Sequence, residues 1–386
     1  MKSGMYDAVV LGAGIAGACL AYSLAKRGWN VLLLDRRTGS AHKACGEFLS
    51  PEARHSLRGL GLEKTVDRLV SEPIHKVSLH SSGGAALEWR LAAPSVGVSR
   101  QLLDEALRTE ATKAGANWLG GATALSVRAQ PGGYRVRVRN QAGVEAELEA
   151  RTVFGSWGRN GSPALAGKTS DRAQRSFRGV GWKVHARGLE TRQAVELYFF
   201  KGGYVGLAPI GDGLTNAAAL VEFSTAQKAP KGTLGWLKLA AESNPAFARR
   251  FEGALPLAET ERAAAPIRTS DKAAAWRDYP LLGDAALIIP PLCGDGMAMA
   301  LRSAEACAPL ADAYLRGEIS MEGWKSEYVR LVKEELEKPA KWGRRLQSCL
   351  IHPPVARLLL SLGAASPKLA HAAFRATRLA LPAQPT

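Results

Sequence analysis

The sequence lacks any apolar run of about 18 residues, the length that a membrane-spanning helix needs. Its first strand-like segment starts at Tyr6, which leaves no room for a signal peptide. The five cysteines are scattered, no Cys-x-x-Cys pair occurs, and the seven histidines form neither a triad nor a metal-ligand pattern. We therefore expect a cytoplasmic protein with reduced thiols and no bound metal.

Modules for nucleic-acid binding are missing as well, although the formal net charge is +16. No helix-turn-helix or zinc finger is visible, and the basic residues do not form one patch with interleaved aromatics. We expect no nucleic-acid partner. The charge remains compatible with attraction to an anionic membrane surface, or with a basic surface that has no specific partner.

What the sequence does contain is a βαβ unit with a dinucleotide-binding fingerprint. Residues 6–11 read as a buried strand, the glycine-rich segment 12–17 follows, and residues 18–27 read as a helix. A second apolar strand, residues 29–34, leads into Asp35. An acidic residue at about this distance from the glycines is typical of a ribose ligand.

Each glycine of this fingerprint has a physical task. Gly12 permits the tight turn out of the strand, Gly14 lets the backbone approach a pyrophosphate, and Gly17 lets the helix pack closely on the sheet. The free N–H groups and the positive dipole end of the helix attract phosphate groups. The segment predicts a dinucleotide site but does not specify which dinucleotide binds.

The pattern of secondary structure changes near residue 176, and the chain returns to the first domain near residue 280. Residues 176–223 read as four strands with short glycine turns, which is typical of an antiparallel sheet. Residues 280–282 read as a last apolar strand, and a long helix is expected over residues 296–315. Residues 324–381 have the pattern of several basic, apolar helices. This order indicates a nucleotide-binding domain that a second domain interrupts.

Residues 279–300, with the sequence YPLLGDAALIIPPLCGDGMAMA, resemble the second FAD motif of the class A flavin monooxygenase and geranylgeranyl reductase superfamily. Gly283 and Asp284 match a strand end whose Asp holds the ribityl chain of FAD. Residues 290–291 match a proline-rich loop, and residues 294–296 match a glycine turn that starts a helix aimed at the isoalloxazine ring. Such a helix start favours the negative charge that a reduced flavin carries.

The resemblance covers about residues 5–320 and implies FAD held non-covalently, with NAD(P)H as a transient reductant. Further matches are Arg100 at the head of a helix and the Cys45-Gly46 segment, which lies beside the flavin in geranylgeranyl reductases. No second glycine-rich fingerprint is visible, so we expect no separate NADPH domain. The residues expected to bind FAD are Gly12, Gly14, Ala16, Gly17, Asp35, Arg36, Cys45, Gly46, Arg100, Gly283, Asp284, Pro291, Gly294, Asp295, Gly296 and Met297.

The fold that this resemblance implies is α/β. A Rossmann-like FAD-binding domain of the para-hydroxybenzoate hydroxylase type would be interrupted by an antiparallel-sheet substrate domain and followed by a C-terminal helical region. We assign residues 1–75, 96–165 and 270–320 to the FAD-binding domain, 76–95 and 166–269 to the substrate domain, and 321–386 to the helical tail.

Two stretches depart from patterns of the family. Trp157 stands where the family's middle motif, here residues 154–160, carries an Asp that touches FAD and NAD(P)H in hydroxylases. This departure leaves the mode of flavin reduction open. The stretch that corresponds to the Trp-x-Trp-x-Ile-Pro segment of flavin-dependent halogenases lacks both tryptophans, which disfavours a halogenase.

Three residues are candidates for chemistry. Cys45 and Glu47 read either as a wall of the flavin pocket, with Glu47 as an acid or base, or as a structural thiol and an acid near the start of a helix. Tyr204 opens a segment that resembles the far wall of the family's substrate pocket. Strand alternation places Tyr198 and Phe200 on one face, which is either pocket wall or ordinary core. The expected pocket residues are Trp182, Tyr198, Phe200, Tyr204 and Pro209.

The tail combines positive charge with apolar residues. Residues 341–345 are basic and residues 351–362 are apolar, and Lys368, Arg375 and Arg378 then alternate with apolar residues at helical spacing. Such a helix suits peripheral contact with an anionic membrane. Two further interpretations are a cap on the substrate domain and a dimer contact.

The leading hypothesis is an FAD-dependent monooxygenase that hydroxylates a lipophilic aromatic or phenolic small molecule through a flavin C4a-hydroperoxide. One alternative is a geranylgeranyl-reductase-like enzyme that saturates isoprenoid double bonds. The other is a non-enzymatic or maturation flavoprotein. Oxygen consumption with a phenol would indicate the first, anaerobic turnover of a polyprenyl substrate the second, and a tight protein partner without either activity the third.

Overall fold

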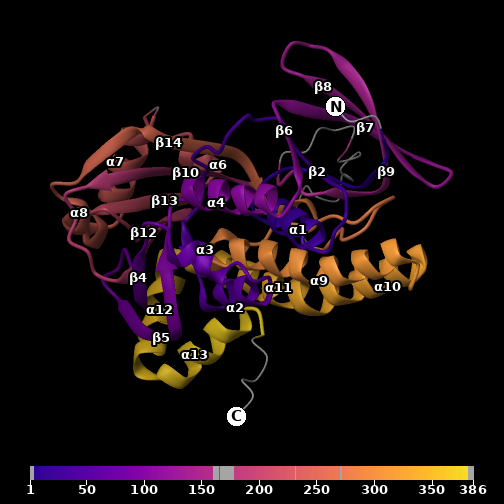
Figure 1. The fold of residues 1–386 in the computed structure, drawn as a ribbon. Helices are drawn as coiled ribbons and strands as arrows, with labels where there is room; N and C mark the ends of the chain where they lie inside the picture. Colours follow the sequence, from indigo (N-terminus) through magenta and orange to yellow (C-terminus); the bar gives the residue numbers. More distant parts are fainter. Residues whose placement is uncertain (1–3, 160–164, 166–177, 231, 270–271, 381–386) are drawn as a thin grey trace.

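The computed structural model describes residues 4–159, 165, 178–230, 232–269 and 272–380, which form two sheets with helices packed on them (Figure 1). The first sheet has six strands in the order β6-β2-β1-β9-β8-β7. β1, β2, β6 and β9 run parallel, whereas β7, β8 and β9 form an antiparallel meander. The strands are β1 (Tyr6–Leu11), β2 (Val31–Asp35), β6 (Asn117–Gly120), β7 (Ala122–Gln130), β8 (Gly133–Asn140) and β9 (Glu145–Gly155).

Helices cover one face of this sheet because their apolar sides meet the buried strands. α1 (Ile15–Ala25) packs between β1 and the long helix α9 (Gly296–Arg316), and small buried residues such as Ala18 and Ala21 allow the close approach. The other helices of this layer are α2 (Pro51–Gly59), α3 (Glu63–Asp67), α4 (Arg100–Lys113) and α10 (Met321–Val332). The sheet and these helices place the carboxyl ends of β1 and β2 at the start of α1.

The second sheet has eight strands in the order β14-β10-β13-β12-β11-β4-β5-β3. All neighbours pair antiparallel except β11 and β4, which are parallel. The strands are β3 (Phe48–Leu49), β4 (Glu72–Ser81), β5 (Ala86–Gly97), β10 (Arg178–Arg187), β11 (Ala194–Phe200), β12 (Gly203–Gly211), β13 (Leu214–Glu222) and β14 (Leu255–Arg268).

The two faces of this second sheet pack against different helices. α7 (Thr233–Ser243) and α8 (Pro245–Phe251) cover one face, and the short helix α6 (Phe223–Ala226) leads to them. The opposite face turns toward the tail helix α12 (Pro353–Ala365), as Figure 1 shows. Within each strand, alternate residues therefore belong to two separate cores.

The tail continues from α10 through a π-helical turn (Lys333–Glu337) into α11 (Lys338–Leu350), α12 and α13 (Pro367–Ala376). Among the described residues, no single helix has both the length and the apolar character to cross a membrane. One pair of helical segments, Met321–Leu350 and Pro353–Ala365, has this length and apolar character when the two are taken together. The chain bends by 114° between them. Figure 1 shows α12 and α13 returning beneath the second sheet, next to β4 and β5.

This architecture confirms the predicted α/β fold with an interrupting sheet and a helical tail. The exact domain boundaries stay a prediction, although β4 and β5 extend beyond the range 76–95 at both ends. Residues 280–282 were predicted as a strand, which is wrong, because they form only isolated bridges to Gly155 and Trp276. Parts of the predicted ranges lie outside the described residues, namely 1–3, 160–164, 166–177, 270–271 and 381–386.

Candidate active site

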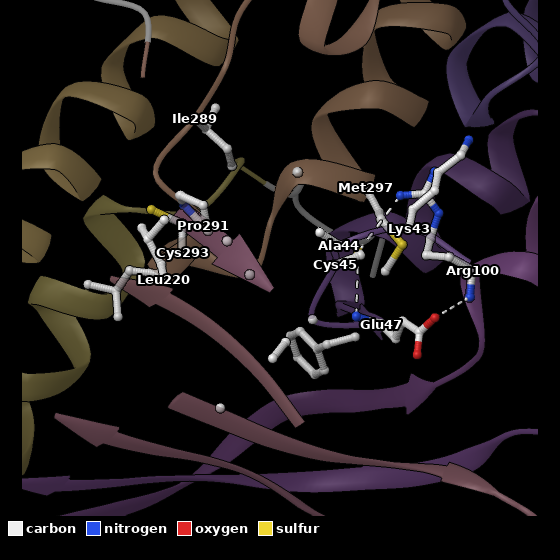
Figure 2. A pocket seen from close by; sticks show the side chains of 18 of the residues that line it. Lys43, Ala44, Cys45, Glu47, Arg100, Leu220, Ile289, Pro291, Cys293 and Met297 are labelled. Carbon is white, nitrogen blue, oxygen red and sulfur yellow. Dashed lines mark hydrogen bonds between the residues drawn. The ribbon is translucent and has the colours of Figure 1, made fainter. Parts of the chain in front are cut away.

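A single large cavity of about 720 Å³ joins the two sheets and the tail. One end lies at the start of α1, between Gly14 and Asp35, and the middle passes Cys45 and Met297. Figure 2 shows the side chains around this middle part. The far end is apolar and is lined by residues of the second sheet and the tail, among them Val77, Leu79, Leu197, Tyr204, Leu220, Leu350, Leu360 and Phe374.

The glycine-rich turn has the geometry that the fingerprint requires. Gly12 has φ 111°, and a Cβ there would lie 2.5 Å from the carbonyl oxygen of Ser156. A Cβ on Gly17 would lie 1.9 Å from the carbonyl oxygen of Gly12. Both positions therefore exclude a side chain, and both glycines act through packing, since neither borders the cavity.

The space above the helix start is open for a phosphate group. A Cβ on Gly14 would meet only Lys43 Nζ, at 3.7 Å, and no side chain caps the first N–H groups of α1. Asp35 is the last residue of β2 and accepts a hydrogen bond from the backbone N–H of Ala13 at 2.9 Å. Free N–H groups, a nearby ammonium and a carboxylate at the strand end together fit the pyrophosphate and ribose of a dinucleotide.

The second motif borders the same cavity. Gly283 has φ 56°, and a Cβ there would lie 3.4 Å from the Cβ atoms of Ala16 and Ala300. Asp284 is partly exposed at the cavity, and Arg159 Nε lies 3.5 Å from its carboxylate. Of the residues expected to bind FAD, those that border the cavity are Gly14, Ala16, Asp35, Arg36, Cys45, Gly46, Arg100, Gly283, Asp284, Pro291, Gly294, Gly296 and Met297.

Asp295 is an exception, and its predicted contact with FAD is wrong. The side chain is fully buried and does not border the cavity. It accepts a hydrogen bond from Ser50 Oγ at 2.8 Å and lies 3.0 Å from Arg378 Nη2. Asp295 therefore joins the start of α9 to Arg378 of the C-terminal tail, while the neighbouring backbone of Gly294 and Gly296 faces the cavity.

Arg100 lies in a buried ion network at the cavity wall. Its guanidinium contacts Asp104 at 3.0 Å and Cys45 Sγ at 3.7 Å, and Lys43 also pairs with Asp104. Burial acts to lower the pKa of Arg100, but the charges of Asp104 and Cys45 and the hydrogen bonds to them together outweigh it and raise the pKa. Arg100 therefore stays cationic beside the cavity.

Glu47 is the centre of a second buried network. Its φ is 55°, unusual for a residue with a side chain, and one carboxylate oxygen accepts the backbone N–H of Arg100 at 2.9 Å. The same carboxylate lies 3.2 Å from Lys183 Nζ and 2.6 Å from His185 Nε2. Figure 2 shows the Glu47 side chain at the cavity wall near Cys45 and Arg100.

The network extends to His42, which the sequence reading left out together with Lys183 and His185. The expectation that the histidines form no set is wrong, because ligand atoms of His42, Glu47 and His185 lie within 4.8 Å of one another. Lys183 Nζ contacts all three residues, at 3.4 Å from His42 Nδ1, so an ammonium stands among them. A sequence signal did exist: Lys183 and His185 are two apart on one strand and share a face.

The substrate wall differs from the one predicted. Tyr198 and Phe200 share a face, as expected, but it packs on α7 and α8, and Tyr198 contacts Phe247. Pro209 also lies outside the cavity lining, and the ring of Trp182, although that residue borders the cavity, stacks on Trp236 at 5.8 Å. Only Tyr204 among the predicted aromatics presents a ring to the cavity-side core. Alternation identifies residues on one face but not which face meets the cavity.

Comparison with known proteins agrees with this site. A family model described as FAD binding domain matches residues 5–326, and the chain belongs to this family. Digeranylgeranylglycerophospholipid reductase 2 of Methanopyrus kandleri is 25% identical over 351 residues, 87% of this chain and 84% of that protein. Menaquinone reductase of Mycobacterium tuberculosis is 29% identical over 329 residues, 80% of this chain and 76% of that protein.

Solved structures show that the fold is shared. A geranylgeranyl bacteriochlorophyll reductase-like protein of Thermoplasma acidophilum superposes with a TM-score of 0.79 over 96% of each chain, at 18% identity. A myxobacterial chondrochloren halogenase gives a TM-score of 0.73 at 22% identity, over 84% of this chain and 78% of that chain. Family and site together make the protein an FAD-dependent oxidoreductase.

Proposed function

We propose that the protein is a flavin-dependent monooxygenase that hydroxylates a lipophilic phenol carrying a long apolar chain. The observation that carries this proposal is the composition of one continuous cavity. Its far end is lined by aliphatic and aromatic side chains from Val77 to Phe374, whereas its wall near Glu47 holds acidic and basic groups. An apolar chamber next to a few polar groups suits an amphiphilic molecule.

The chain's own residues would bind and orient such a substrate. Leu350 and Leu360 of the tail face Leu79 and Tyr204 of the second sheet, so a hydrocarbon chain between them would be removed from water. The hydroxyl would then lie toward the polar wall, where Glu47, backed by Lys183 at 3.2 Å, can hold or move its proton. FAD, when bound along the glycine-rich turn, supplies the two-electron chemistry and the reaction with oxygen.

The test uses purified, yellow holoenzyme with NADH or NADPH and an alkylated phenol. Hydroxylation predicts that the phenol speeds up oxygen uptake and that one atom from labelled dioxygen appears in the product. A phenol without the alkyl chain serves as the matched control and should give a higher KM, because it leaves the apolar chamber empty. Absence of label in any product would overturn the proposal.

A second candidate is saturation of double bonds in a polyprenyl chain. It is favoured by relatives named as a digeranylgeranylglycerophospholipid reductase and a menaquinone reductase, which align with most of this chain. The apolar chamber suits an isoprenoid as well as an alkyl chain. Anaerobic turnover of a polyprenyl lipid, with a product heavier by two hydrogens for each bond reduced, would select this reaction over hydroxylation.

We also propose that the substrate comes from an anionic membrane surface in contact with α12 and α13. Leu362 and Leu369 border the cavity, and their side chains are nevertheless 54% and 67% exposed. Leu358, on the same helix as Leu362, is 59% exposed. Exposed basic residues, Arg357 and Lys368, stand beside them. Apolar and basic groups together match the acyl and headgroup layers of an anionic bilayer.

Co-sedimentation with anionic vesicles tests this contact. Full-length protein should pellet with vesicles of anionic phospholipid, and the variant Leu358→Ser, Leu369→Ser should stay largely in the supernatant. Point substitutions are preferable to removal of the tail, because Arg378 in the tail is buried against Glu52. Equal pelleting of both proteins, or none, would overturn the contact.

A further inference from the structure

The cluster of Glu47, Lys183, His185 and His42 contains one ring nitrogen with two competing partners. His185 Nε2 lies 2.7 Å from Lys183 Nζ and 2.6 Å from Glu47 Oε2. It can accept a proton from the ammonium or donate one to the carboxylate, but it cannot do both at once. The cluster therefore has two arrangements of hydrogen bonds that differ by the movement of one proton.

Of the four residues in this cluster, His42 is the most accessible to solvent. Glu47 and Lys183 are 0% exposed and His185 is 3% exposed, whereas His42 is half-buried. His42 borders the cavity near the exposed Arg262, and Glu47 borders it near Cys45. Lys183 Nζ lies 3.4 Å from His42 Nδ1 and thus connects the accessible ring with the enclosed groups.

We propose that these four side chains form a proton relay between the accessible His42 and the cavity wall at Glu47. A proton moves from Lys183 Nζ to His185 Nε2 and on to Glu47 Oε2, and Lys183 takes its replacement from His42. The reverse sequence takes a proton from the cavity wall at Glu47 and releases it at His42. Each step breaks one N–H or O–H bond and forms another, so the relay needs no oxidant or reductant.

Burial and the neighbouring charges shift the pKa values of three members of the relay. Burial and the charge of Lys183 lower the pKa of His42 to about 4, so its ring is neutral and can accept a proton. Burial lowers the pKa of Lys183 below its usual value, although Glu47 opposes this. Burial acts to raise the pKa of Glu47, but the hydrogen bond from His185 and the charge of Lys183 outweigh it and lower the pKa. The other charged or titratable groups facing the cluster are Arg100, Arg262 and Cys45.

A relay at this wall serves either reaction described above. Hydroxylation of a phenol is helped by loss of its O–H proton, and saturation of a double bond consumes two protons and two electrons, equivalent to one hydride and one proton. The relay therefore does not depend on which substrate the cavity holds. Its test must follow the proton itself rather than turnover.

The measurement is exchange of the proton between His185 and Glu47 with water. A hydrogen bond of 2.6 Å to a carboxylate gives a far-downfield proton resonance, whose exchange can be followed by magnetisation transfer from water in the holoenzyme. In His42→Asn the exchange should slow by about a hundredfold, the lower end of what a positioned proton-transfer group contributes. His371→Asn, on the exposed face of α13, is the matched control and should leave the exchange unchanged.

Two further variants separate a relay from a structural role. In His42→Gly, added imidazole should restore the exchange, because a free ring can carry the proton where a packing contact alone would not. Lys183→Met keeps the length of the side chain but interrupts the relay, and it should also slow the exchange while His185 keeps its hydrogen bond to Glu47. Unchanged exchange in His42→Asn with an unaltered melting temperature would overturn the relay. A failure of the proposed hydroxylation would leave this measurement intact.

Discussion

Arg378 of the C-terminal tail lies 3.0 Å from Asp295, the residue before the long helix α9, and both side chains are buried. The same guanidinium pairs with Glu52 at 2.6 Å and donates a hydrogen bond to the carbonyl oxygen of Cys293 at 2.7 Å. The end of the tail is therefore attached directly to the loop that carries the second FAD motif. One buried cation thus links the tail, which lines the apolar chamber, to the start of α9 and to α2.

The first prediction concerns this cation. Arg378→Met should lower the free energy of unfolding by about 3–5 kcal/mol, because it leaves the carboxylates of Glu52 and Asp295 buried without a cationic partner. Urea unfolding of the holoenzyme measures the change. Arg375→Met, exposed near the end of α13, is the control and should change stability by at most about 0.5 kcal/mol. Equal stability of the two variants would contradict this role of Arg378.

The second prediction concerns pH. Burial raises the pKa of Asp295 from its usual 3.8 to about 6, so its contribution to stability is fully present below pH 3.8 and is lost as the pH rises through 6. The shift of about two units corresponds to about 3 kcal/mol. Asp295→Asn should remove this loss, so the variant should gain stability relative to the native chain between pH 4 and 6.

The pKa of Glu52, in the same cluster, is shifted in the opposite direction to that of Asp295. Burial acts to raise its pKa, but the hydrogen bond and charge of Arg378 outweigh it and lower the pKa below its usual 4.5. Its contribution is present above pH 4.5 and is lost as the pH falls through the lowered value. Glu52→Gln should therefore lower the stability of the folded protein most at neutral pH and least in acid. Thermal unfolding at several pH values measures this difference.

The fourth prediction concerns the glycine-rich turn. Gly17→Ala should lower stability by about 1–3 kcal/mol and reduce the FAD content of the purified protein, since the new Cβ would overlap the carbonyl oxygen of Gly12. Gly323→Ala in α10 is the matched control. Its Cβ would meet only Ser320 Oγ, at 3.4 Å, and helix propensity favours Ala by about 1 kcal/mol. Full flavin content in Gly17→Ala would show that the turn tolerates a side chain.

The fifth prediction concerns the apolar chamber. Leu360 is buried and borders the cavity, whereas Leu358, two residues earlier on α12, is exposed and lies outside its lining. Leu360→Trp should fill the chamber and raise KM for a long-chain substrate by about tenfold, equivalent to about 1.4 kcal/mol, with flavin absorbance unchanged. Leu358→Trp should leave KM close to the native value. Similar KM values in both variants would mean that the chain binds elsewhere.

The prediction from sequence was strongest where neighbouring residues carry the information. The glycines at 12, 14 and 17, the acid at Asp35 and the turn around Gly283 perform their tasks through local backbone geometry. The dinucleotide site and the α/β class therefore followed from short segments, and FAD as the cofactor followed from the resemblance of residues 279–300 to a family motif. The prediction for Asp295 failed because its contact with FAD was transferred from a motif, while a distant arginine determines where its side chain points.

By itself, the sequence determined a dinucleotide site and the order of sheets and helices, because hydrogen bonding and steric fit within a βαβ unit are set by residues close in the chain. The choice of FAD came from the resemblance of residues 279–300 to a known family motif. Only the tertiary structure decided which face of the second sheet meets the cavity, that Lys183 and His185 join Glu47 across 136 and 138 residues, and that Arg378 reaches Glu52 across 326. Burial of these charges requires partners, and packing alone selects the partners from distant parts of the chain.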